Sequence, residues 1–154
     1  MPKVTIRQYQ SSDKDFVWQL HLKGLHQMNS FIDDPNLDKD LQSIEEVYIN
    51  NKGEFFIATI HNQIVGIGAL KKIDNEHAEI KRMRVDQEFQ GQKIGSQILD
   101  SLIQKAQELS YKKLILDTSI KMHVAQNLYQ SRGFDEYKRD TIGGLETIFY
   151  EKVL

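Results

Sequence analysis

Five stretches of the chain carry apolar residues in the pattern of β-strands. Apolar residues alternate with polar ones, or form short β-rich runs, over 4–9, 55–60, 64–70, 78–85 and 147–153. Only His61-Asn62-Gln63 separates the second stretch from the third, which predicts a hairpin. The turn-forming residues Asp74-Asn75-Glu76 then lead into the next stretch, so three strands follow one another in an antiparallel meander.

Apolar residues at helical spacing predict four helices. They cover 14–25, 38–49, 94–109 and 122–132. Side-chain oxygens at 11–13 can cap the first helix, and Ser43 with Glu46 predicts a capping pair in the second. The segment 33–36 between these two helices has the sequence Asp-Asp-Pro-Asn, which predicts a loop.

The short apolar run Leu114-Ile115-Leu116 is typical of a strand covered on both faces. The helix before it allows a crossover to a parallel neighbour, and the helix after it ends at Gly133-Phe134 with a left-handed glycine. These elements predict an α+β fold of three layers, in which helices flank a twisted, mixed and mostly antiparallel sheet. The length of 154 residues suits one domain over 1–154.

The fourth predicted strand changes its pattern part-way. Apolar residues fall on even positions as far as Ile80 and on odd positions from Met83. One extra residue in a strand restores the apolar face after such a slip, so we expect a β-bulge over 81–83. The alternative is that the aliphatic stem of Arg82 simply lies on the core face.

Composition and charge exclude several classes of protein. Hydrophobic residues make up 40% and charged residues 27% of the chain, as in a folded globular protein. The absence of cysteine excludes disulfides, thiolate nucleophiles and cysteine zinc sites, and it suits a reducing, cytoplasmic location. The net charge of −2, with both signs interspersed, argues against a nucleic-acid partner. No apolar run is long enough for a signal core or a membrane span, so we expect a soluble protein without a membrane partner.

Two glycines before the third predicted helix suggest an anion site. Gly91 and Gly95 let the backbone turn tightly, and the first amides of a helix bind phosphates at the positive end of its dipole. The segment lacks the Gly-Lys-Ser/Thr of a Walker loop and the three glycines of the dinucleotide fingerprint. By themselves, two such glycines are more often plain turn residues.

Together with other segments, this loop resembles the GNAT superfamily of acyl-CoA-dependent N-acyltransferases. The matching stretches lie in order and are Glu79-Ile80-Lys81-Arg82-Met83-Arg84-Val85, the loop Gln90 to Gly95, the strand Leu114 to Ser119, and the helix end Leu128-Tyr129-x-x-x-Gly133-Phe134. The resemblance implies a GNAT-like fold with acetyl-CoA as cosubstrate. It also implies transfer of the acetyl group to a primary amine, by direct attack in a ternary complex.

The resemblance further implies which residues bind acetyl-CoA. In relatives the bulged strand splays from its neighbour, and the pantetheine arm binds main-chain groups that correspond to Met83 and Val85. The expected cofactor-binding residues are Met83, Arg84, Val85, Gln90, Gly91, Gln92, Lys93, Ile94, Gly95, Ser96 and Asn127. Two departures concern affinity: Lys93 stands at a usual glycine position, and Met122 at a usual asparagine position that Asn127 replaces only weakly.

Tyr129 and Glu79 are the expected catalytic residues. A phenol of pKa about 10 is protonated at pH 7, so Tyr129 can donate a proton to the leaving thiolate; the alternative is a core tyrosine. Glu79 corresponds to the carboxylate that some relatives use as general base. A partly buried glutamate with a raised pKa suits that role, and the alternative is a solvated residue paired with Lys81 or Lys72.

Histidines and early aromatic residues are weaker candidates. His21 and His26 are five residues apart and do not share a helix face, so we expect no metal site. His77 and His123 flank the expected site, but ordinary surface histidines are the commoner case. Four residues of mainly core type lie in the region where relatives form the acceptor wall: Trp18, Met28, Phe31 and Tyr48.

Two other functions stay open from the residues alone. A non-catalytic acyl-CoA sensor or scaffold would bind the cofactor without turnover, and Lys93 is compatible with that reading. A nucleotide-phosphate binder would use only the loop from Gly91 to Gly95. The sequence identifies neither the acceptor amine, whose pocket is formed by variable loops, nor whether the chain forms a homodimer.

Overall fold

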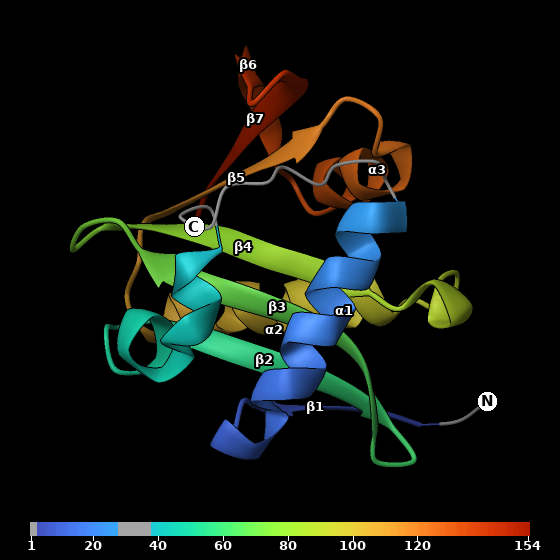
Figure 1. The fold of residues 1–154 in the computed structure, drawn as a ribbon. Coiled ribbons are helices and arrows are strands. Elements are labelled where there is room, and N and C mark those ends of the chain that lie inside the picture. Colours follow the sequence, from blue (N-terminus) through green and yellow to red (C-terminus); the bar gives the residue numbers. More distant parts are fainter. Residues whose placement is uncertain (1–2, 28–37) are drawn as a thin grey trace.

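The computed structural model describes residues 3–27 and 38–154, and these contain seven strands in one twisted sheet (Figure 1). The strand order is β1-β2-β3-β4-β5-β7-β6. The strands are β1 (Val4–Gln8), β2 (Glu54–Ile60), β3 (Gln63–Lys72), β4 (His77–Val85), β5 (Lys113–Ser119), β6 (Asp135–Ile142) and β7 (Leu145–Val153). In this sheet β4 and β5 run parallel, and the other neighbouring pairs are antiparallel.

Helices cover both faces of the sheet, which confirms the predicted fold class (Figure 1). On one face lie α1 (Lys14–Gln27) and two short helical segments, η2 (Lys39–Gln42) and η3 (Glu45–Ile49). On the other face lies α2 (Ile94–Glu108), which connects β4 to β5; α3 (His123–Ser131) follows β5. The 3₁₀ turns η1 (Ser11–Asp13) and η4 (Gln87–Phe89) come before α1 and α2. None of the helices in the described part of the chain has the length and apolar character needed to cross a membrane.

The two faces of the sheet belong to two apolar cores, because alternate strand residues point to opposite sides. Under α2, Ile98 and Leu102 are fully buried and belong to the same cluster as Leu114 of β5. Under α1, Val17 packs in a second cluster with Phe55 of β2. The direction of each side chain on β4 therefore decides whether it faces α2 or α1.

Most of the predicted elements are confirmed, including the β2–β3 hairpin, the meander to β4 and the parallel β5. His61 and Asn62 take the left-handed conformation that a tight hairpin needs, with φ of 50° and 63°. Gly133 also has a left-handed φ of 86°, and the Phe134 N–H donates to the Tyr129 carbonyl oxygen at 3.1 Å, as the helix-end pattern predicts. The loop predicted at 33–36 lies outside the described residues.

The second predicted helix is wrong in its continuity. η2 is a 3₁₀ turn and η3 a π-helical turn, and Ser43 between them has a non-helical φ of −140°. η3 begins without a side-chain cap, so the predicted pair of Ser43 and Glu46 does not form. Tyr48 and Arg82 both donate to the Asp40 carboxylate, and the chain departs from a regular helix where it presents this group to them.

The sequence pattern does not predict β6, because this strand has no apolar face. Every residue from Asp135 to Ile142 is exposed, and the strand pairs with β7 alone at the edge of the sheet. A strand that water covers on both faces lacks the alternation on which the prediction depends. Its charged residues also discourage pairing with another chain.

Candidate active site

β4 contains the predicted bulge. Its register with β3 pairs Ala69 with Lys81 but Ile67 with Arg84, so β4 has one more residue than β3 between these pairs. Arg82 lies at the bulge and takes the left-handed conformation, with φ of 60°. Beyond it, the side chain of Met83 packs into the core under α2, whereas the arginines on either side of Met83 face α1.

β4 and β5 separate soon after they meet. Their parallel ladder ends at the pair of Glu79 and Ile115, although β4 continues to Val85 and β5 to Ser119. Between 80 and 85, β4 therefore has no ladder partner on the β5 side. Unpaired main-chain groups of this kind can bind an extended, amide-bearing ligand.

The loop after β4 leads directly into the N-terminus of α2. Gly91 has a left-handed φ of 83°, and the Gln90 side chain donates to the Val85 carbonyl oxygen at 3.1 Å. At Gly95 an added Cβ would lie 3.7 Å from side-chain atoms of both Val85 and Leu128. The end of β4, the start of α2 and the helix α3 thus meet at this loop, where the first amides of α2 can bind phosphate.

Lys93 is left-handed, with φ of 65° and ψ of 21°, and it is the N-cap residue of α2. A side chain in this conformation is strained, whereas glycine adopts it freely. We expect Lys93→Gly to raise the free energy of unfolding by up to about 1 kcal/mol in urea denaturation. The neighbouring Gln92 does not have a positive φ, so Gln92→Gly is the matched control and is expected to lower stability. Equal losses in both variants would contradict this account of Lys93.

Tyr129 lies at the C-terminal end of α3 with its ring in the core. Only 5% of the residue is exposed, and its ring packs against Phe134 and Tyr150 at centroid distances of 6.0 and 6.1 Å. The described residues make no hydrogen bond to its hydroxyl group. Burial raises the pKa of Tyr129 to about 12, and the nearby Arg84 cation opposes that rise. The phenol is therefore protonated at neutral pH.

Two carboxylates lie beside the point where β4 and β5 separate. Glu79 belongs to the last pair of the ladder, with Ile115, and Asp117 lies two residues further along β5 on the same face as Ile115. Burial raises the pKa of Glu79, and the charge of Asp117 raises it further, although Lys81 opposes the rise. Partial desolvation also raises the pKa of Asp117, although the residue as a whole is exposed and Lys81 opposes this rise too. The predicted pairing of Glu79 with Lys81 or Lys72 does not occur as a close ion pair among the described residues.

Asp117 is not among the site residues that the sequence predicts. The signal that could have identified it is the parallel pairing itself, because a strand neighbour two residues past Ile115 must point to the same face as Glu79. Asp117 keeps contact with solvent and makes no ion pair among the described residues. It is therefore a second candidate for accepting a proton at this position.

A family model described as the acetyltransferase (GNAT) family matches residues 16–134, which include every candidate described above. The chain belongs to the GNAT family. The acetyltransferase of the GNAT family from Staphylococcus aureus Mu50 has a TM-score of 0.88 and 29% identity, covering 98% of this chain and 99% of that one. The GNAT family acetyltransferase from Elizabethkingia anophelis, solved with acetyl-CoA bound, has a TM-score of 0.71 and 26% identity, covering 98% of each chain.

A curated N-acetyltransferase is similar over a shorter region. The uncharacterized N-acetyltransferase YsnE of Bacillus subtilis is 34% identical over 82 residues, which make up 52% of this chain and 54% of that protein. The match spans about half or less of the length of the first curated relatives. Along nearly their whole length, by contrast, these two solved GNAT structures share the fold of this chain.

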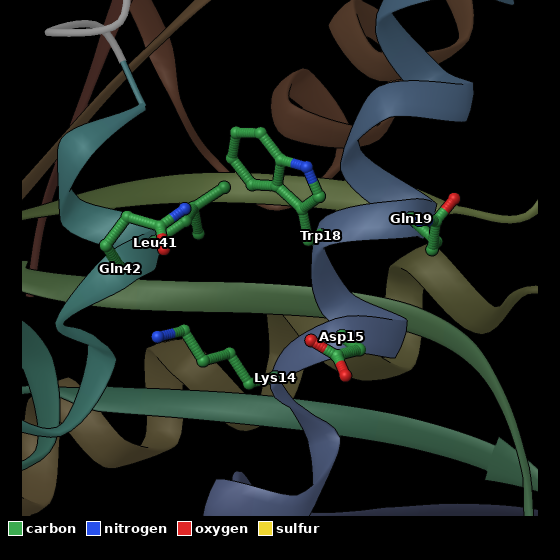
Figure 2. A pocket seen from close by; sticks show the side chains of 6 residues that line it. All are labelled: Lys14, Asp15, Trp18, Gln19, Leu41 and Gln42. Carbon is green, nitrogen blue, oxygen red and sulfur yellow. The ribbon is translucent and has the colours of Figure 1, made fainter.

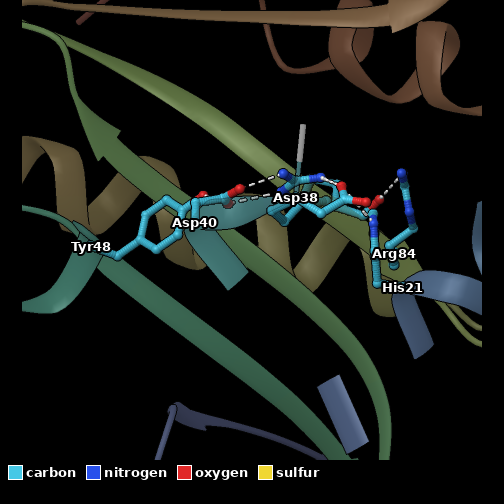
Figure 3. A network of polar contacts seen from close by, with 7 residues as sticks. His21, Asp38, Asp40, Tyr48 and Arg84 are labelled. Carbon is cyan, nitrogen blue, oxygen red and sulfur yellow. Dashed lines mark hydrogen bonds and ion pairs between the residues drawn. The ribbon is translucent and has the colours of Figure 1, made fainter. Parts of the chain in front are cut away.

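On the α1 side of this GNAT sheet, Arg82 holds a network of buried polar groups (Figure 3). Its guanidinium donates to Asp38 and Asp40, and the Tyr48 hydroxyl also donates to Asp40. Burial lowers the pKa of Arg82, but the hydrogen bond and charge of Asp40, with the charges of Tyr48 and Asp38, raise it by more. The ion pairs therefore persist at neutral pH. Tyr48, predicted as a core residue that also lies near the acceptor wall, is fully buried and takes part in this network.

A groove of about 420 Å³ runs between α1 and η2 on the same side of the sheet. Trp18 of α1 points across it toward Leu41 of η2, and Lys14 and Asp15 lie nearby (Figure 2). The groove therefore combines an aromatic wall with charged groups of both signs. Met28 and Phe31, the other two residues predicted near the acceptor wall, lie outside the described residues.

The remaining candidates lie at the margins of the site. Asn127 is exposed on α3, and His123 is exposed at the start of the same helix. His77 is bound to Asp74 of the preceding turn, with 2.9 Å between its Nδ1 and the carboxylate. His21 is fully buried under α1, and the side chain of His26 is not described. No group of three potential metal ligands is found within the described parts of the chain.

Proposed function

We propose that the protein transfers the acetyl group of acetyl-CoA to a primary amine by direct attack in a ternary complex. The observation that carries the proposal is the separation of β4 from β5 after Glu79. Along the chain, the freed part of β4 contains the bulge and is followed by the glycine loop before α2. Membership of the GNAT family and a solved relative with acetyl-CoA bound support the same cosubstrate.

Successive segments from β4 to α2 match successive parts of acetyl-CoA, from the pantetheine arm to the pyrophosphate. The main chain of Met83 to Val85, free on the β5 side, would hold the pantetheine amides. The loop from Gln90 to Gly95 and the first amides of α2, including Ser96, would hold the pyrophosphate. The Lys93 ammonium is exposed on this loop and is free to approach a phosphate. Asn127 stays a weaker member of the predicted set, because it lies on an exposed face of α3.

The chemistry divides among three side chains. The amine nitrogen attacks the thioester carbonyl carbon, and the proton that it loses passes to the carboxylate of Glu79 or Asp117, directly or through water. A main-chain N–H left free by the bulge would stabilise the tetrahedral oxyanion. As the carbon–sulfur bond breaks, the Tyr129 hydroxyl group donates a hydrogen bond to the developing thiolate, which leaves as CoA thiolate and takes its proton from water. A phenol of pKa about 12 is a weaker acid than a thiol of pKa about 8.5, so hydrogen-bond donation is the larger part of this role.

Thiol release from acetyl-CoA, measured across a panel of amines, tests the proposal. At least one amine is expected to give release that is linear in enzyme concentration. An acyl-CoA sensor, the main rival, would bind acetyl-CoA but release no thiol with any amine. A nucleotide-phosphate binder would bind ADP as tightly as CoA, so competition between the two separates the second rival.

CoA is expected to raise the melting temperature in a saturable way, because a ligand that binds only the folded state stabilises it. Gly91→Val should abolish this shift by blocking the approach of phosphate to the loop. The matched control is Gly144→Val, since both glycines have nearly equal left-handed φ, 83° and 81°, and open space around an added Cβ. Both variants should lose similar stability from strain, but only the first should lose the CoA shift. If CoA still raises the melting temperature of both variants, binding at this loop is contradicted.

Three further predictions, on domain number, cellular location and oligomeric state, belong to the same proposal. One continuous sheet supports a single domain over 1–154. A cytoplasmic location stays a prediction that rests on the lack of cysteine and on use of acetyl-CoA. Homodimer formation stays a prediction as well, and sedimentation velocity would test it.

A further inference from the structure

Arg84 is a cation without an acidic partner in the described structure. Its Nη1 donates to the Met83 carbonyl oxygen at 3.2 Å, whereas its Nε is buried and bonds to nothing. Its neighbour Arg82, by contrast, is held by Asp38 and Asp40. Burial lowers the pKa of Arg84 and the charge of Arg82 lowers it further, while Tyr129 and the more distant charge of Asp38 oppose this; a guanidinium stays protonated at neutral pH. An unpaired charge in such a place is strongly unfavourable unless a ligand completes it.

α1 has a glycine, Gly24, at the point where the Arg84 side chain crosses it. A Cβ at Gly24 would lie 2.7 Å from Cδ of Arg84 and 3.0 Å from its Nε, so the arginine stem passes directly over this glycine. Glycine inside a helix lowers its stability, and this close approach accounts for its presence. The residue that lowers the stability of α1 therefore lies directly against the unpaired Arg84 of β4.

A second unsatisfied group lies next to Arg84 (Figure 3). His21 is fully buried one helical turn before Gly24, and its Nε2 lies 2.9 Å from an oxygen of Asp38. Burial lowers the pKa of His21, so the ring is neutral, its Nε2 donates to Asp38 and its Nδ1 is an acceptor without a partner. An unused donor of Arg84 and an unused acceptor of His21 thus occur together on the α1 side of β4.

We propose that Arg84 binds the carboxylate of the amine acceptor, which makes small amino carboxylic acids the substrate class of this site; the inference rests on the proposed acetyl transfer. A guanidinium and a carboxylate match in charge and in planar geometry. The side chain faces α1, on the opposite side of β4 from Met83 and Val85, and so lies away from the cofactor path. The charge of Arg84 acts on the Tyr129 phenol, so a carboxylate bound by this guanidinium would lie within electrostatic range of the proposed reacting end of acetyl-CoA.

Pairs of acceptors that differ only in the carboxylate test the proposal. Thiol release is measured with glycine, alanine, β-alanine and lysine, and with the amide of each, in which an uncharged carboxamide replaces the carboxylate. For at least one pair, kcat/KM of the parent is expected to favour the acid by about 10- to 100-fold. Arg84→Gln should remove this preference by slowing the acid alone, and Arg84→Lys should restore part of it. Arg139→Gln, at an exposed arginine of β6, should change neither rate.

The outcomes separate this inference from the proposed function. Preference for the amides, or an equal loss for acid and amide in Arg84→Gln, would overturn the carboxylate site while leaving acetyl transfer intact. A weaker CoA-induced shift in melting temperature in that variant would assign the side chain to the cofactor instead and would also overturn it. If no amine releases thiol, the proposed function fails, and the subsite is then tested by titrating N-acetyl-β-alanine against the His21 ring resonances. A shift in the parent that disappears in Arg84→Gln supports the subsite, and no shift in the parent rejects it.

Discussion

Tyr129→Phe is expected to lower kcat by about 10² to 10⁴ while leaving the affinity for acetyl-CoA almost unchanged. The substitution removes one hydroxyl group and keeps the ring that packs against Phe134 and Tyr150. A hydrogen bond to the ground-state cofactor is worth only about 1 kcal/mol, whereas the expected loss in rate corresponds to about 3 to 5 kcal/mol. Steady-state kinetics and a CoA titration of the melting temperature measure the two effects separately.

Tyr150→Phe is the matched control, since it removes a hydroxyl group from the neighbouring buried ring. Tyr150 is 1% exposed and lies on β7, so its loss reports on packing alone. We expect kcat of this variant to stay within a factor of about three of the parent. If both variants lose rate equally, or if Tyr129→Phe lowers only the melting temperature, Tyr129 is a packing residue and another group stabilises the thiolate.

Glu79→Gln is expected to lower kcat by about 10² at neutral pH, with the loss shrinking as pH rises. A base works only when ionised, and the raised pKa of Glu79 means that its share of the rate disappears as pH falls through that value. At high pH more of the amine is already deprotonated, so the base matters less. The pH profile of kcat for parent and variant, measured with a saturating acceptor, gives the comparison.

Asp117→Asn separates the two carboxylates. Because the charge of Asp117 raises the pKa of Glu79, removing it should move the acid limb of the profile to lower pH and should cost less rate than Glu79→Gln. If Asp117 is instead the base, the larger loss will follow its substitution. A loss independent of pH in both variants would rule out general-base catalysis by either group.

The stability of these variants supplies a control with a definite sign. An acid whose pKa is raised in the folded state stabilises the fold below its unfolded pKa, and this contribution is lost as pH rises through the folded value. Ionised Glu79, which is half-buried, is therefore unfavourable in the folded state at neutral pH, whereas water offsets most of this effect at the exposed Asp117. The amide variants should melt at the same or a higher temperature than the parent at pH 7, so a lower rate cannot be attributed to unfolding.

Local pattern was enough to predict the elements that form the cofactor path. The slip between Ile80 and Met83 indicated the bulge, since the same strand must keep apolar residues inward on both sides of it. The glycine loop and the helix end at Gly133-Phe134 were equally visible, because a left-handed residue leaves a signature in sequence. Arg82 and Lys93 are exceptions on this path, as both are left-handed without being glycine.

Features that depend on contacts between distant segments were not predictable from pattern. Asp117 joins Glu79 only because β4 and β5 pair in one register, and no spacing in the sequence shows that register. Asp40, in the second predicted helix, binds Arg82, which lies 42 residues away in the sequence. The unpaired Arg84 likewise looked like one more residue of a cofactor strand, until its side chain proved to lie on the α1 side over Gly24.

The central claim is tested most directly by following a ¹³C-labelled acetyl group from acetyl-CoA in a mixture of the protein with candidate amines. Mass spectrometry of the products would show both the fate of the label and the nitrogen that receives it. The account predicts an N-acetylated amine formed over many turnovers, in equal amount to free CoA, and far less product with Tyr129→Phe. Acetyl-CoA that binds saturably but keeps its label in the presence of every amine would contradict it.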